Sequence, residues 1–225
     1  MRTKPTEVLL IFDLDGTLVD SSGQILAALN ETCRELNYSL ISEEFFATKI
    51  GLPIKLIISY LNLDKSNEFN LISIFRAKLQ KSIEESNSLY EGVEEFLALS
   101  KTLGFNLAIA TSKPTYLAEL VVAKSPLFRY IDFVQGTDNF PAKPAPDVVL
   151  RCLKHFNTGS GIMFGDRVED MDAASSAGII SIGLAQGHHT VENLVNNGAR
   201  FAYRNFSELL DNNHRVWKLC NLEKS

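Results

Sequence analysis

The chain has 225 residues, of which 45% are hydrophobic, and its 27 acidic and 22 basic residues give a formal charge of −5. This composition supports a buried core in one large domain, or in one domain with an insert, and it excludes intrinsic disorder. The negative charge provides no general attraction to nucleic acid or to anionic membranes, so a polyanionic ligand must be held by a local site.

The cysteines and the apolar runs indicate the cellular compartment of the protein. Cys33, Cys152 and Cys220 are far apart and form neither a CxxC pair nor a cysteine–histidine cluster, which favours a reducing cytosol over a disulfide framework or a zinc site. The apolar run that begins at Val8 meets Asp13 too soon for a signal peptide, and no stretch approaches the ~18 apolar residues of a membrane span. We therefore expect a cytoplasmic protein with no membrane partner.

Short apolar runs that alternate with helical patterns predict a doubly wound α/β fold. A continuous apolar run is typical of a strand buried on both faces of a parallel sheet, and the intervening helices provide the crossovers. Glycines end two of these helices, and a proline stands in the first turn of another. The predicted strands are residues 8–12, 106–110, 133–135, 162–164 and 179–182, and the predicted helices are 93–103, 114–124, 147–155 and 169–177.

One interval lacks strands. From about residue 21 to residue 86 the sequence shows only helical periodicity, in segments 25–36, 42–49, 53–61 and about 68–84. We expect a helical cap domain, residues 21–86, inserted into a catalytic α/β core formed by residues 1–20 and 87–225. The last ~20 residues, with Trp217, predict a terminal helix and a polar end.

The first candidate site follows the first predicted strand. Asp13 and Asp15 flank a leucine and precede Gly16 and Thr17, at the carboxyl end of a strand, where open α/β sheets bind their ligands. Residues two apart at a strand end point to the same side, so two carboxylates there need a cation or a proton. Mg²⁺, which prefers hard oxygen ligands, is the natural partner.

Three further motifs follow in chain order. Thr111 and Ser112 stand after the second strand and before a helix whose N-terminal amides could bind an anion, although such a pair is usually only a helix cap. Lys143 lies in a loop stiffened by two prolines. Asp166 follows a strand, and Asp170 lies in the first turn of the next helix, where negative charge is favoured.

The four motifs, taken in chain order from residue 8 to about residue 183, resemble those of the haloacid dehalogenase-like hydrolase superfamily. The helical insert resembles the cap of the phosphoglycolate phosphatase-like and β-phosphoglucomutase-like members of that superfamily. The resemblance implies that Asp13 attacks phosphorus to form an aspartyl-phosphate and that Asp15 acts as general acid and base. It assigns phosphate binding to Thr111, Ser112 and Lys143.

The same resemblance implies a Mg²⁺ cofactor. Its ligands would be the side chains of Asp13 and Asp166, the backbone carbonyl of Asp15, and Asp170 directly or through water. Asp172 and Glu169 are expected to be solvent-exposed charges, because helical spacing turns them to other faces. Arg167 stands where the family often has serine or threonine.

Substrate choice is expected to depend on the cap. The segment around Gly51 resembles a specificity loop, and the flanking Lys49 and Lys55 are candidates for binding a substrate carboxylate. The alternative is that Gly51 and its neighbouring proline only separate two helices while both lysines face solvent. His188 and His189 lie in a glycine-containing loop that either approaches the site or is only a polar helix cap.

These features predict a phosphatase for a small phosphorylated metabolite, with 2-phosphoglycolate as the leading candidate. Because Asp15 is present, the resemblance excludes the dehalogenase and phosphonatase subclasses. A sugar-phosphate mutase of the β-phosphoglucomutase type and an inorganic pyrophosphatase are alternatives on the same scaffold. A catalytically inactive phosphate-sensing module is a non-enzyme alternative, but it would be expected to have lost a nucleophile or a metal ligand.

Overall fold

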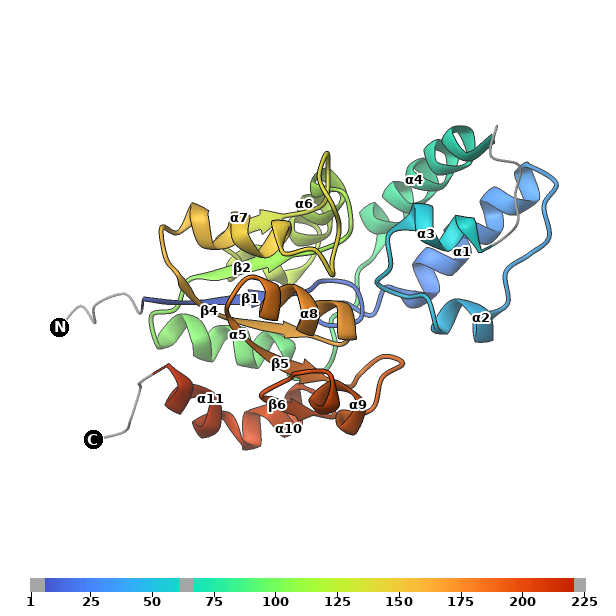
Figure 1. Cartoon of the computed structure of the whole chain (residues 1–225). Coiled ribbons are helices and arrows are strands. Elements are labelled where there is room, and N and C mark those ends of the chain that lie inside the picture. The colour runs from blue at the N-terminus through green and yellow to red at the C-terminus, as the bar shows by residue number, and fades with distance from the viewer. Residues whose placement is uncertain (1–6, 61–66, 221–225) are drawn as a thin grey trace.

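A parallel six-stranded sheet forms the centre of the molecule (Figure 1). The computed structural model describes residues 7–60 and 67–220. The strand order is β3-β2-β1-β4-β5-β6, and each neighbouring pair is parallel, so the carboxyl ends of all the strands lie at one edge. The strands are β1 (Val8–Phe12), β2 (Leu107–Ala110), β3 (Phe133–Gln135), β4 (Ser160–Gly165), β5 (Ile180–Leu184) and β6 (Phe201–Tyr203).

Helices cover both faces of this sheet. Strand β1 shows why: Leu10 and Phe12 face one layer, whereas Leu9 and Ile11 face the other, as the two-residue period of a strand requires. One layer contains α5 (Val93–Thr102), α6 (Thr115–Ala123), the short 3₁₀ helix η2 (Pro126–Arg129), α10 (Phe206–Asp211) and α11 (Asn213–Leu219). The other contains α7 (Asp147–His155) and α8 (Val168–Ser176), and α9 (Val191–Asn196) packs against α8, β5 and β6.

In the described residues between β1 and α5, four helices lie beyond the carboxyl ends of the strands (Figure 1). Two connections lead to them and back. These run side by side, since Asp20 N donates to Ser88 O at 2.9 Å and Val19 bridges Leu89 in antiparallel fashion. We call this group the cap, and it consists of α1 (Ser22–Glu35), α2 (Glu43–Ala47), α3 (Ile54–Ser59) and α4 (Glu68–Glu85).

The expected α/β fold class is confirmed, with some differences in detail. Strand β6 was not predicted, because three residues flanked by polar side chains carry no periodic signal. Strand β3 is half-buried at every position, not buried on both faces, since it lies at the edge of the sheet. The predicted helix over 53–61 is observed as Ile54–Ser59, and residue 61 lies outside the described residues.

The C-terminal segment contributes to the core. The expected terminal helix is α11, and its Trp217 stacks against Phe96 and Phe105, with ring centroids 5.5 Å apart in both pairs. The three cysteines are buried and free. Within residues 7–60 and 67–220, no helix is long and apolar enough to cross a membrane.

Candidate active site

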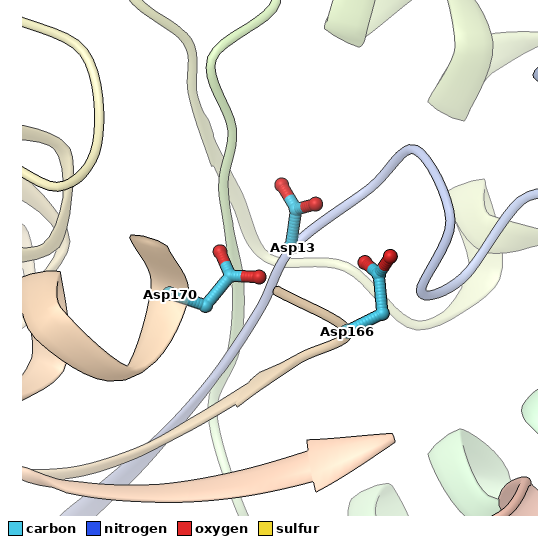
Figure 2. A group of neighbouring side chains, drawn as sticks. All are labelled: Asp13, Asp166 and Asp170. Carbon is cyan, nitrogen blue, oxygen red and sulfur yellow. The ribbon is translucent and has the colours of Figure 1, made fainter. Parts of the chain in front are cut away.

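Three buried carboxylates converge at the carboxyl edge of the sheet (Figure 2). Asp13 follows β1, Asp166 follows β4, and Asp170 lies in the first turn of α8. One oxygen from each lies within 4.8 Å of the others, and the residues are only 1–2% exposed. The adjacent parallel pairing of β1 with β4 brings these residues together although more than 150 positions separate Asp13 from Asp166 in the chain.

Lys143 is the cation that the protein places in this cluster. Its Nζ lies 2.6 Å from Asp13 Oδ1 and 2.6 Å from Asp170 Oδ1, and it donates to the carbonyl of Ala110 at 3.0 Å. Burial by itself would lower the pKa of Lys143, but Asp13 and Asp170 raise it above the ordinary value. The ammonium therefore stays charged and holds both carboxylates in place.

One lysine does not balance three carboxylates. The pKa of Asp13 is raised from 3.8 to about 6, chiefly by burial. The charges of Asp170 and Asp15 also raise this pKa, and Lys143 offsets these effects only in part. Burial, and then the charges of Asp170 and Asp13, raise the pKa of Asp166 well above its ordinary value. A buried all-oxygen cluster with surplus negative charge has the donor chemistry that Mg²⁺ prefers, so these residues fit a divalent cation.

The backbone around the cluster is shaped to admit it. Gly16 has φ +90°, and a Cβ at this position would lie 2.7 Å from Asp166 Oδ2, so a side chain there would meet the carboxylate directly. Thr17 Oγ1 donates to Asp166 Oδ1 at 2.8 Å. The Arg167 amide donates to Asp170 Oδ2 at 3.1 Å, which caps α8 while it orients the carboxylate.

Asp15 does not join the carboxylate cluster. Its side chain instead pairs with Lys113, whose Nζ lies 3.0 Å from Oδ1 and 2.9 Å from Oδ2, and it accepts a hydrogen bond from Ser21 Oγ at 2.6 Å. The expected need of these two carboxylates for a cation is met by two different lysines, since Lys113 pairs with Asp15 and Lys143 pairs with Asp13. The proposed metal contact of Asp15 through its backbone carbonyl stays a prediction.

Sequence reasoning missed Lys113 as a site residue. It stands between Ser112 and a proline, directly after β2, and its side chain is buried although lysine is rarely so. The signal was its place in the Thr-Ser-Lys-Pro motif. Thr111 is buried beside it and accepts a hydrogen bond from the Lys113 amide at 3.2 Å, whereas Ser112 is half-buried.

A cavity of about 370 Å³ lies between the core and the cap. On the core side it is lined by Asp15, Ser112 and Lys113, and on the cap side Gly51 and Lys55 are among its lining residues. The remaining walls are mostly apolar. The two-sided lining means that a molecule in this cavity contacts both the carboxyl edge of the sheet and the helices of the cap.

The candidate specificity residues occupy different environments. Lys55 is exposed at the cavity wall. Lys49 is not among the lining residues, and its Nζ lies 4.4 Å from the centre of the Tyr60 ring, an arrangement typical of a cation–π contact. His188 is exposed and lines a second cavity, and His189 is half-buried, with a pKa lowered by burial and by Arg167.

Arg167 joins the core to the cap. Its guanidinium donates to the carbonyl of Ile50 and pairs with Glu169 at 3.1 Å. Gly51 has φ +79°, and a Cβ there would lie 2.6 Å from Arg167 Cδ, so the loop packs directly on the arginine stem. Glu169 is thus an ion-pair partner of Arg167, not the isolated solvent charge expected from helical spacing, whereas Asp172 is exposed as expected.

Known proteins share this arrangement of motifs and folds. The family model for haloacid dehalogenase-like hydrolases matches residues 10–184. The chain is 31% identical over 222 residues to a phosphoglycolate phosphatase of Colwellia psychrerythraea, which covers 93% of this chain and 98% of the relative. It is 30% identical over 219 residues to the probable phosphatase IndB of Dickeya dadantii, and this alignment covers 94% of this chain and 95% of the relative.

The fold has solved counterparts at similar coverage. The crystal structure of a protein described as a predicted phosphatase from Clostridium acetobutylicum superimposes with a TM-score of 0.82 at 28% identity, over 94% of this chain and 98% of that one. A structure from Streptococcus pneumoniae, described as a haloacid dehalogenase-like family hydrolase, gives a TM-score of 0.81 at 26% identity, with 92% and 99% covered. The similarity therefore includes the cap as well as the sheet.

Proposed function

Because the chain belongs to the haloacid dehalogenase-like hydrolases, we propose that it is a Mg²⁺-dependent phosphatase that removes phosphate from a small metabolite through an aspartyl-phosphate on Asp13. The observation that carries this proposal is the different environment of two carboxylates only two residues apart. Asp13 belongs to the cluster with Asp166 and Asp170, whereas Asp15 pairs with Lys113 at the cavity wall. Two carboxylates in distinct environments are suited to two chemical roles.

The roles follow from these positions. Asp13 attacks phosphorus, and the bond from phosphorus to the ester oxygen breaks as the aspartyl-phosphate forms. Asp15 gives a proton to the departing oxygen and then takes a proton from the water that attacks the same phosphorus, which releases inorganic phosphate and regenerates Asp13. Lys113 and Ser21 hold the Asp15 carboxylate in one orientation.

We assign phosphate binding to residues at the carboxyl end of β2 and in the loop before α7. Thr111 and Ser112 follow β2, and Lys143 lies within hydrogen-bonding distance of Asp13, where it offsets the charge of both nucleophile and phosphate. When bound, Mg²⁺ would be held by Asp13, Asp166 and Asp170 and would offset the remaining negative charge of the phosphoryl group. The core would thus provide chemistry, and the cap would enclose the leaving group.

The first substrate to test is 2-phosphoglycolate, since relatives named phosphoglycolate phosphatase align over nearly the whole chain. Cap residues such as Lys55, at the cavity wall, would contact the part of the substrate that leaves. We expect a cytoplasmic protein with this chemistry to act on phosphate monoesters of low molecular mass.

The test is phosphate release from a panel of phosphorylated metabolites with Mg²⁺ or with EDTA, using the wild-type protein and Asp13→Asn. We expect turnover of at least one ester that disappears with EDTA and in Asp13→Asn. Asp172→Asn is the matched control, since this exposed residue of α8 is not part of the carboxylate cluster. Turnover by Asp13→Asn near the wild-type rate would contradict the assigned nucleophile, and isomerisation of a sugar phosphate without phosphate release would favour a mutase.

A further inference from the structure

An arginine stands within the apolar face of the cap helix α4. Ile72, Arg76, Leu79 and Ile83 follow one another at spacings of three and four residues, which places them on one side of the helix. The three aliphatic residues are buried and Arg76 is half-buried. A cation in such a stripe is costly unless a partner compensates for its lost hydration.

The protein offers Arg76 no such partner within residues 7–60 and 67–220. Its Nε is buried and makes no hydrogen bond there, and no carboxylate of those residues forms an ion pair with it. Lys78 on the same helix shows the contrast, because its Nζ lies 2.8 Å from Glu35 Oε2 and 4.0 Å from Glu31 Oε2. The charge of Lys78 is compensated by α1, whereas Arg76 has no carboxylate partner among the described residues.

Arg76 lines the same cavity as Asp15 and Lys113. Asp15 from the core and Arg76 from the cap therefore line one cavity. Many of its other lining residues are apolar and come from both cap and core, among them Phe46, Ile57, Phe75 and Leu117. These three features describe a leaving group with a negative charge and an apolar body.

We propose that Arg76 binds a carboxylate of the substrate's leaving group, so that the preferred substrates are phosphate monoesters of hydroxy acids with an apolar body. The inference rests on the proposed function, because Asp15 marks the leaving-group side of the cavity. A guanidinium holds a carboxylate through two parallel hydrogen bonds, which neither a neutral group nor a lysine reproduces. 2-Phosphoglycolate has the carboxylate but only one methylene, so a larger carboxylated ester should be the better substrate.

The test uses two phosphate esters that differ only in one group, phenyl phosphate and 4-carboxyphenyl phosphate, with the Mg²⁺-loaded protein. Arg76→Met keeps the apolar stem and removes the charge. It should lower kcat/KM for 4-carboxyphenyl phosphate about 10- to 100-fold, the effect of losing one charged hydrogen-bonded pair, and leave phenyl phosphate within about 2-fold. Lys78→Met, the matched control on α4, should leave both values unchanged. Equal losses for both esters, or no loss for either, would overturn the proposal.

A binding measurement separates this inference from the proposed function. Calorimetry on Asp13→Asn should show tighter binding of 4-carboxyphenyl phosphate than of phenyl phosphate, and Asp13→Asn with Arg76→Met should lose that preference. If the wild-type protein hydrolyses neither ester while this preference persists, the proposed function fails and the Arg76 site stands. If turnover is present but neither binding nor kcat/KM depends on Arg76, the Arg76 site is refuted and the phosphatase remains.

Discussion

Removing the charge of Asp13 should stabilise the metal-free protein at neutral pH. Burial beside Asp170 raises the pKa of Asp13 from 3.8 to about 6. Since the folded-state pKa exceeds the unfolded-state value, the stability contributed by this carboxyl is fully present below about pH 3.8 and is lost as the pH rises through about 6. Each unit of difference between the folded-state and unfolded-state pKa corresponds to about 1.4 kcal/mol of unfolding free energy, so the complete loss of stability is about 3 kcal/mol. About 2 kcal/mol of this loss falls between roughly pH 4.5 and 7.5.

The measurement is urea unfolding in EDTA at those two pH values, for the wild-type protein, Asp13→Asn and the exposed control Asp172→Asn. The free energy of unfolding of Asp13→Asn should gain about 2 kcal/mol relative to wild type as the pH rises, whereas that of Asp172→Asn should track the wild type. Adding Mg²⁺ at the higher pH should then favour the wild type, because a ligand stabilises the form that binds it. A pH-independent difference between Asp13→Asn and wild type would refute the reasoning.

Two further substitutions probe the contacts around the cavity. Lys113→Met removes the ammonium that lies 2.9 Å from Asp15, so kcat should fall about 10-fold or more. The loss should be larger for alkyl phosphates than for 4-nitrophenyl phosphate, because the 4-nitrophenolate leaving group needs no proton. Equal losses for both substrates would argue that Lys113 does not position the acid. Gly51→Ala places a methyl 2.6 Å from Arg167 Cδ at φ +79°, so thermal unfolding should show a loss of about 1–2 kcal/mol, and steady-state kinetics should show a raised KM. Gly23→Ala is the control, because a Cβ there meets nothing within 4 Å and alanine favours the helix α1, so this variant should lose no stability and keep the wild-type KM.

The catalytic edge was predictable because its signals are local. The run from Val8 to Phe12 is apolar at every position, and the structure gives β1 these same bounds. The sequence placed Asp13 and Asp166 at the ends of two strands, and the resemblance implied that they share a site, whereas the structure shows that the parallel pairing of β1 with β4 brings them together. The end of the predicted cap helix 53–61 stays a prediction, because residue 61 lies outside the described residues.

The ion pairs were less accessible to sequence reasoning. Lys113 and Asp15 are 98 residues apart, and although the Thr-Ser-Lys-Pro motif marks Lys113 as a candidate, it does not indicate that the side chain pairs with Asp15. Glu169 was misjudged for a related reason. Helical spacing correctly turns it away from the carboxylate cluster, but the Arg167 side chain, two residues earlier and outside the helix, brings a cation to it.

By itself the sequence determined the α/β class, the order of the motifs and the carboxylates at the strand ends, because hydrophobic periodicity and turn residues act over a few positions. Only the tertiary structure decided which lysine neutralises which aspartate, and that Arg76 of the cap, which has no carboxylate partner among the described residues, lines the same cavity as Asp15. These features depend on side-chain directions and on packing between the cap and the core. No local pattern encodes them, because each partner lies in a different element and the contact forms only when the chain closes over the sheet.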